Sequence, residues 1–237
     1  MLRPTLVLFT VLALASAVPA FGQHSDVEFD YQNNQITIQD AEFSGLDADW
    51  LFESEFPVDG LSENFSSDPG FASEVAEGLG INPGDDIFLN FIVSPTLGGA
   101  LQYHDGVGFA STTANISVED NAPSTPDLVI STGGFSGDNP QFLQTADAAG
   151  DIHSHVDFTL SSDAEVGAYG VLLQLQTSSP GIADSVPFWI IFNHGLDEDV
   201  FENVVVPSFQ SSVPEPGSLF TLGVAAIFLG TRRRRRA

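Results

Sequence analysis

Two histidines separated by one residue, His153 and His155, are the clearest candidates for chemistry in this chain of 237 residues. In an extended strand, alternate side chains point to the same face, so both imidazoles and the Asp157 carboxylate should lie on one surface. Two imidazoles at this spacing suit Zn²⁺ or Cu²⁺, with further ligands supplied by another strand. The spacing therefore predicts half of a metal site.

A segment near the start of the chain repeats this pattern. His24-Ser25-Asp26-Val27-Glu28-Phe29 matches His153-Ser154-His155-Val156-Asp157-Phe158 at four identical positions and one shared acidic position. If the two strands are neighbours, His24 and Asp26 complete a four-ligand site with His153 and His155. The alternative is a solvated strand face that binds no ion. Participation of His104 or His194 also stays open.

The composition excludes several kinds of active site. The chain has no Cys, and its six basic residues are Arg3 and the five arginines at 232–236, so thiol catalysis, Schiff bases and a lysine-bearing phosphate loop are absent between residues 23 and 213. Of the 32 acidic residues, all except Glu215 lie in that stretch. Such a body repels nucleic acid, which leaves divalent ions, cationic partners or neutral sugars.

Clustered carboxylates keep two alternatives open. Asp85 with Asp86, and the acidic run 197–199, could serve a glycosidase, and with Asp47 and Asp49 they could bind Ca²⁺ in loops. Adjacent acids arise by chance in so acidic a chain, and none has the EF-hand spacing. We therefore predict a non-enzymatic binding or structural domain. The alternatives are an extracellular carbohydrate-active or copper enzyme and a calcium-dependent adhesion module.

Short alternating segments must position these residues. Apolar residues at 27, 29 and 31 alternate with acids, and the alternation resumes at 36 and 38 after Asn33-Asn34, which predicts a hairpin because Asn tolerates positive φ. Further strands are predicted at 87–93, 100–104, 115–118, 127–131, 152–160, 168–176 and 188–193, with short helices at 70–78 and 197–204. Burial is predicted for Trp50 and Trp189. Many short strands separated by turn residues predict an all-β fold, a single antiparallel β-sandwich or jelly-roll-like domain.

The first 22 residues have the pattern of a secretory signal peptide. A cationic start is followed by an apolar stretch too short to span a bilayer and by small residues at 17, 20 and 22. The predicted organisation is thus a signal helix in 1–22, an acidic β-sandwich domain in 23–211 and a separate segment in 212–237.

That last segment has three parts. Pro214, Glu215 and Pro216 hold the backbone extended, and an apolar membrane helix is predicted at 219–231. Five arginines then keep its end on the cytoplasmic side: Arg232, Arg233, Arg234, Arg235 and Arg236.

This tail resembles the PEP-CTERM sorting signal of bacterial exported proteins; a plain tail anchor is the alternative. The resemblance implies an exosortase-type enzyme that cuts near residues 214–216, a transient membrane anchor, and a mature protein secreted or displayed at the cell surface, where exopolysaccharide matrix is an expected partner. A fainter resemblance links His153 and His155 to PEP-CTERM proteins grouped as zinc-uptake-repressor-regulated, which carry a His-x-His strand. It implies zinc as the metal, beside copper or calcium.

Overall fold

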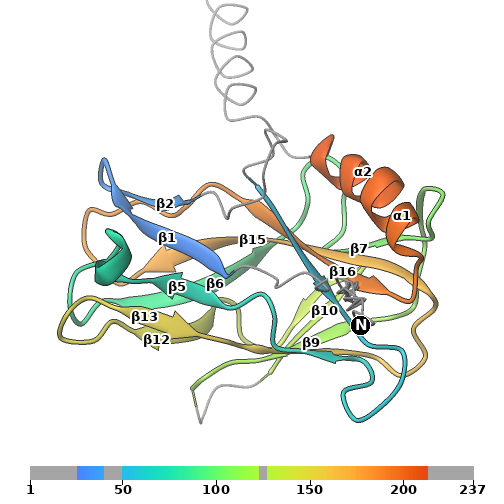
Figure 1. The fold of residues 1–237 in the computed structure, drawn as a ribbon, viewed down its shortest axis with the longest axis horizontal. Helices are drawn as coiled ribbons and strands as arrows, with labels where there is room; N and C mark the ends of the chain where they lie inside the picture. Colours follow the sequence, from blue (N-terminus) through green and yellow to red (C-terminus); the bar gives the residue numbers. More distant parts are fainter. Residues whose placement is uncertain (1–25, 40–49, 123–126, 213–237) are drawn as a thin grey trace, which may run out of the picture.

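Sixteen strands and one short helical segment make up most of residues 26–39, 50–122 and 127–212, the parts that the computed structural model describes (Figure 1). The strands are β1 Val27–Gln32, β2 Gln35–Ile38, β3 Leu51–Glu55, β4 Phe65–Ser66, β5 Phe71–Ser73, β6 Asp86–Ile92, β7 Leu101–His104, β8 Phe109–Ala110, β9 Ile116–Glu119, β10 Leu128–Ser131, β11 Gly134–Ser136, β12 Gln141–Thr145, β13 Ile152–Ser154, β14 Asp157–Leu160, β15 Gly167–Thr177 and β16 Phe188–His194. The predicted all-β class is confirmed. The signal segment 1–22 and the membrane helix 219–231 lie outside the described residues.

The first hairpin forms as the alternation predicts. β1 and β2 pair antiparallel from Phe29 with Ile38 to Gln32 with Gln35. Asn33 and Asn34 occupy the two turn positions with φ of 52° and 61°, the left-handed conformation that such a two-residue turn requires. Phe29 and the isoleucines of β2 are buried, whereas the residues between them are not.

The strands form three sheets. Their orders are β13-β5-β1-β2, β11-β10-β9-β14-β4 and β12-β6-β15-β16-β3, with β7 and β8 extending from β15. β1 pairs parallel with β5, and β3 pairs parallel with β16, so two of the three sheets are mixed and not wholly antiparallel as predicted, whereas the sheet of β11, β10, β9, β14 and β4 is antiparallel throughout. Parallel pairing is possible here because a long connection separates the members of each pair. The sandwich or jelly-roll closure stays a prediction.

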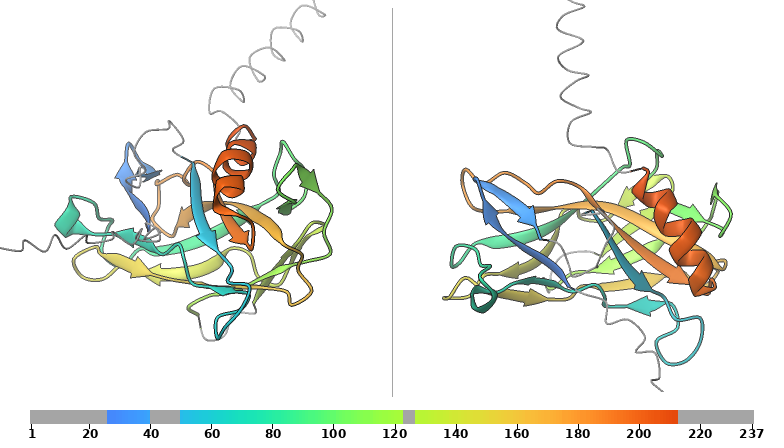
Figure 2. Two further views of the ribbon diagram at one scale, coloured as in Figure 1. Left: turned by 45° about the vertical axis from the view of Figure 1, so that its right-hand side comes forward. Right: turned by 45° about the horizontal axis from the view of Figure 1, so that its top comes forward.

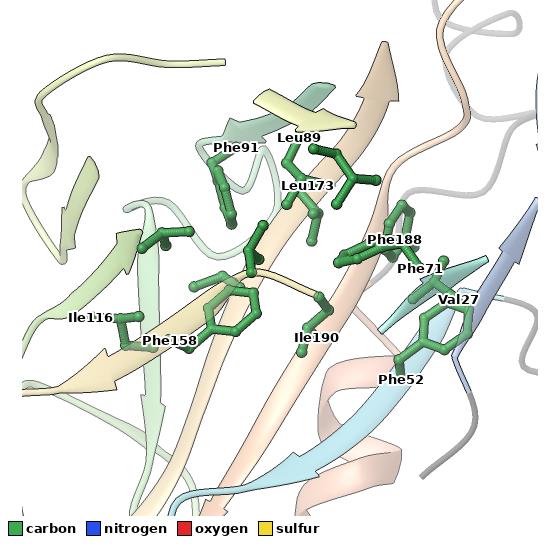
Figure 3. Packing of buried hydrophobic residues seen from close by; sticks show 14 of the residues in the cluster. Val27, Phe52, Phe71, Leu89, Phe91, Ile116, Phe158, Leu173, Phe188 and Ile190 are labelled. Carbon is green, nitrogen blue, oxygen red and sulfur yellow. The ribbon is translucent and has the colours of Figure 1, made fainter. Parts of the chain in front are cut away.

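One hydrophobic cluster joins all three sheets. Figure 3 shows Val27 and Phe71 of the first sheet, Ile116 and Phe158 of the second, and Phe188 of the third in this interior. Aromatic rings supply much of the contact: the Phe158 and Phe192 centroids are 5.1 Å apart, and those of Phe56 and Phe192 are 4.4 Å apart. This shared core therefore fixes the relative positions of the sheets, including the strands that carry the predicted ligands.

A helical segment covers the other face of β15 and β16 (Figure 2). It consists of α1 Glu198–Val200, the π-helical turn η2 Phe201–Val205, and α2 Val206–Gln210. The helix predicted at 197–204 is confirmed and continues to 210. Pro207 has no backbone N–H to donate to the carbonyl one turn earlier, and the wider π-helical turn lies directly before it.

Tryptophan burial follows the prediction at one position. Trp189 is fully buried, with its ring 5.2 Å from that of Phe209 on the helical segment, whereas Trp50 is only partly buried against the main core. No helix within the described ranges is long and apolar enough to cross a membrane.

Two other predictions fail. The helix predicted at 70–78 is instead strand β5 followed by the 3₁₀ turn η1 Val75–Glu77, because residues 71–73 pair with strands on both sides. The strand predicted at 152–160 is divided into β13 and β14, which belong to different sheets. Its alternation of buried and exposed residues nevertheless continues across the break.

Candidate metal centre

Strand β5 brings together the two segments of similar sequence, which begin near Asp26 and His153. β1 lies parallel to β5 on one side, with Val27 opposite Phe71, and β13 lies antiparallel on the other, with His153 opposite Ala72 (Figure 1). Asp26 immediately precedes β1. The two segments are thus not direct neighbours, as the sequence interpretation required, but next-nearest strands about 10 Å apart.

Small residues on β5 and before it let side chains meet across that distance. Ala72 of β5 lies between β1 and the paired residue His153 of β13. The Gly70 carbonyl accepts from the Val27 N–H at 2.8 Å. A Cβ on Gly70 would lie 2.5 Å from Asp26 Oδ1 and 2.6 Å from His155 Cε1. Gly70 therefore provides the space in which these two side chains converge.

Asp26, His153 and His155 form the candidate metal centre. Each offers one ligand atom, and the three atoms all lie within 4.8 Å of one another. His153 Nε2 is 3.1 Å from Asp26 Oδ2, and the imidazole centroids are 5.8 Å apart. The side chains of His153 and His155 are 55% and 40% exposed, and that of Asp26 is 24% exposed, so an ion could enter from solvent.

Both imidazoles are held through their Nδ1 atoms. His153 Nδ1 lies 2.9 Å from Glu74 Oε1, and His155 Nδ1 lies 2.8 Å from the Ser67 carbonyl oxygen, with Asp68 Oδ1 at 3.8 Å. A carbonyl or carboxylate oxygen can only accept, so with an ion bound at Nε2 each neutral ring would donate its Nδ1–H there. Without an ion, Asp26 Oδ2 is an acceptor for His153 Nε2 as well.

Asn121 holds the chain where β13 ends. Its amide donates to the carbonyls of Leu143 and His155, both at 3.0 Å, and to Ser154 Oγ at 2.8 Å. Two of these acceptors belong to the His-x-His segment, so Asn121 positions its backbone. Sequence reasoning missed Asn121, Gly70 and Glu74, because none has a local motif and all three act through contacts distant in sequence.

The other predicted candidates lie elsewhere. His104 is buried on β7, where its Nδ1 accepts from the Gly106 N–H and burial lowers its pKa. His194 is buried at the end of β16 and donates to the Phe56 carbonyl. Asp157 is half-buried on β14, outside the group of three. His24 lies outside the described residues.

The carboxylates considered for calcium or hydrolysis have structural partners. Asp85 accepts from the Tyr31 hydroxyl at 3.0 Å and from Asn82, and this contact together with burial raises the pKa of Tyr31. Asp197 caps the helical segment by accepting from the Asp199 N–H. Asp47 and Asp49 lie outside the described residues.

A second ionisable group, which sequence reasoning missed, lies beneath the helical segment. Glu53 on β3 forms a side-chain hydrogen bond with Glu202 of η2 and lies near Glu198 of α1; we call these three residues the acidic cluster. Burial raises the pKa of Glu53 to about 8, and the charges of Glu202 and then Glu198 add to the effect. The hydrogen-bonded pair of Glu53 and Glu202 therefore keeps a proton near neutral pH.

Comparison with known proteins identifies the end of the chain. A family model of the PEP-CTERM protein-sorting motif matches residues 212–236, so the predicted resemblance of the tail to this sorting signal is confirmed. The residues of its processing motif and arginine cluster lie outside the described ranges. The search of curated proteins and that of solved structures return no match.

Proposed function

We propose that this exosortase-sorted PEP-CTERM protein, exported to the cell surface, displays a β domain that binds one divalent transition-metal ion. Asp26, His153 and His155 would be the ligands, and His24, two residues before Asp26, would be the fourth. The observation that carries the proposal is the convergence of three ligand atoms within 4.8 Å from two segments about 130 residues apart.

The donor set favours zinc or copper over calcium. Two imidazole nitrogens and one carboxylate oxygen suit Zn²⁺ and Cu²⁺, whereas Ca²⁺ takes about 6–8 oxygen ligands. The Nδ1 contacts of both histidines support this assignment, because metal-binding histidines generally donate their other ring N–H to a carboxylate or carbonyl.

The position of the site supports a structural role for the ion. It would link the residue that begins β1 to the exposed side of β13, across β5, and so fasten the start of the mature domain to its sheet. It would also add positive charge to a body that has no Lys or Arg between residues 23 and 213, which relieves repulsion among its carboxylates.

Export and display complete the proposal. Residues 1–22 would be removed as a signal peptide, the segment 219–231 would anchor the chain transiently, and cleavage near Glu215 would release the body toward an exopolysaccharide matrix. The mixed sheets around one core support a sandwich-like closure. Intact-mass analysis of the protein taken from its native surface would locate both processing sites; a mass equal to the full chain would contradict this part.

Zinc binding tests the metal proposal. We expect calorimetric titration of the metal-free full chain with ZnCl₂ to give one ion per chain. His153→Ala should weaken binding by more than about 100-fold, beyond the loss typical of outer-shell changes. Thr159→Ala, an exposed position on the adjoining strand β14, is the matched control and should bind as the native protein does. Unchanged zinc binding by His153→Ala would contradict the ligand assignment.

A further inference from the structure

Carboxylates approach both nitrogens of the His153 ring. Asp26 Oδ2 lies 3.1 Å from Nε2, and Glu74 Oε1 lies 2.9 Å from Nδ1. The two nitrogens point away from each other across an imidazole ring, so the two carboxylates occupy different sides of His153. Asp26 belongs to the group of three convergent ligand atoms, and Glu74 does not.

The fold fixes Glu74 beside His153 by bonds from two elements. The Glu74 carbonyl accepts from the N–H groups of Glu77 at 3.0 Å and Leu79 at 3.1 Å, which closes the turn after β5. The next residue, Val75, donates its N–H to Asp151 Oδ1 at 2.7 Å, and Asp151 precedes His153 by two residues. The turn that carries Glu74 is thereby tied to the strand that carries His153.

From this geometry we infer that Glu74 is a positioning residue of the metal centre, a role that rests on the proposed function. When an ion takes the place of the proton between Nε2 and Asp26, the Glu74 carboxylate accepts the remaining Nδ1–H of His153 and keeps Nε2 turned toward Asp26. The Ser67 carbonyl does the same for His155 at 2.8 Å. Glu74 acts through His153 and does not touch the ion.

The charge of Glu74 adds to its orienting effect. A carboxylate that accepts from the far nitrogen of a ligand imidazole makes the ligating nitrogen more basic and limits ring rotation, and loss of such a partner typically costs about 10–100-fold in metal affinity. The Ser67 carbonyl is neutral and belongs to the backbone. The orientation of the His153 ring therefore depends on a side chain that a substitution can remove, whereas the orientation of the His155 ring depends on a backbone carbonyl.

Zinc titration of the full chain separates these roles. We expect Glu74→Ala to bind zinc about 10–100-fold more weakly with the stoichiometry unchanged. Glu74→Gln keeps an acceptor oxygen without the charge, so it should fall between Glu74→Ala and the native chain. Glu77→Ala, an exposed acid three residues further on, is the matched control and should bind normally.

The absorption spectrum of Co²⁺ in the same proteins distinguishes positioning from ligation. The visible bands of Glu74→Ala should match those of the native chain, because the donor atoms are the same, whereas His153→Ala should alter or lose them. A cobalt spectrum changed by Glu74→Ala would make Glu74 a ligand and overturn the inference. Native affinity in both Glu74 variants would also overturn it.

Failure of this inference can be told from failure of the metal site. A native chain that binds no zinc contradicts the proposed function itself, whereas zinc binding that is indifferent to Glu74 contradicts only the positioning role. If Glu74→Ala fails to fold, as judged by circular dichroism, the nearly isosteric Glu74→Gln carries the test alone, with its smaller expected loss of affinity.

Discussion

The metal centre and the acidic cluster both contain carboxylates, but the fold gives those carboxylates opposite partners. At the metal centre, Asp26 and Glu74 lie beside an imidazole that is more than half exposed. In the acidic cluster, Glu53 lies beneath a helical segment and its partner is a second carboxyl group. The candidate metal centre combines its carboxylate with two imidazoles, whereas in the acidic cluster a partly buried carboxyl group lies beside two exposed ones.

The difference shows what a carboxylate needs in order to bind an ion in so acidic a protein. Imidazoles can serve as neutral ligands that add no repulsion, so the candidate metal centre joins its carboxylate to donors that suit a cation. A partly buried carboxyl beside other carboxyls lowers its free energy by keeping a proton, which is why the pKa of Glu53 is raised to about 8. Clustered acids alone are therefore a poor guide to ion binding here.

Gly70→Ala should break the metal centre and leave the acidic cluster intact. The added Cβ would meet Asp26 Oδ1 at 2.5 Å and His155 Cε1 at 2.6 Å, so the two side chains must separate. We expect zinc affinity to fall by about 100-fold or more, the upper end of outer-shell losses, in calorimetric titration. Gly108→Ala, whose Cβ would meet no atom within 4 Å, is the control. Unchanged affinity in Gly70→Ala would mean that the ligands do not converge as described.

The acidic cluster should make stability fall with rising pH. The pKa of Glu53 is raised from 4.5 to about 8, so between these values the folded state binds more protons than the unfolded state. The stabilising effect is complete below pH 4.5 and is lost as pH rises through 8, at a cost on the order of a few kcal/mol. Urea denaturation at pH 5 and pH 9 measures this loss.

Glu53→Gln should reduce that loss, because its amide has no proton to release. Glu55→Gln, an exposed position on the same strand, is the matched control and should keep the native pH dependence. An equal drop in the free energy of unfolding for Glu53→Gln and the native chain would remove Glu53 as the cause.

Asn121→Ala should weaken the metal centre without touching a ligand. The substitution removes the side-chain donor of the His155 carbonyl and one of two side-chain donors of the Leu143 carbonyl, which Ser154 Oγ also contacts at 3.4 Å, so it should cost about 1 kcal/mol in the free energy of unfolding. Zinc affinity should fall less than it does for Gly70→Ala. Asn203→Ala, which removes an exposed bond to the Asp199 carbonyl, should change neither quantity appreciably, and equal effects from the two variants would refute a special role for Asn121.

Added salt should separate exposed from buried repulsion. Moving from low ionic strength to about 1 M NaCl shortens the screening length to about 3 Å, so repulsion among surface carboxylates weakens and stability should rise by about 1 kcal/mol. The partly buried Glu53 is screened less than the surface carboxylates, so most of the pH 5 to pH 9 difference should persist in high salt. Disappearance of this pH difference at high salt would mean that the Glu53 carboxyl is exposed to solvent.

Local patterns predicted the parts of the fold that depend on local physics. The hairpin of β1 and β2 follows from alternation and from two asparagines that tolerate positive φ, and both appear as expected. The exposed alternation of His153 and His155 follows from the same period of two. The PEP-CTERM sorting motif was equally predictable, because its three parts follow one another directly in the sequence.

The arrangement around the ligands was not predictable, because it depends on strand pairing across long sequence separations. β5 has only three residues, and its surroundings were interpreted as a helix, yet it is the strand that brings Asp26 and His153 together. Glu53 and Glu202 are far apart in the chain, and their contact exists only because the helical segment packs over β16 and β3. Nothing in the nearby residues marks either contact.

X-ray absorption at the zinc edge of the zinc-loaded full chain tests the central claim most directly. The account predicts a first shell that contains three imidazole nitrogens and carboxylate oxygen at about 2.0–2.2 Å, with outer scattering from imidazole rings that falls sharply in the double variant His153→Ala, His155→Ala. An oxygen-only shell, or a spectrum that the double variant leaves unchanged, would contradict it.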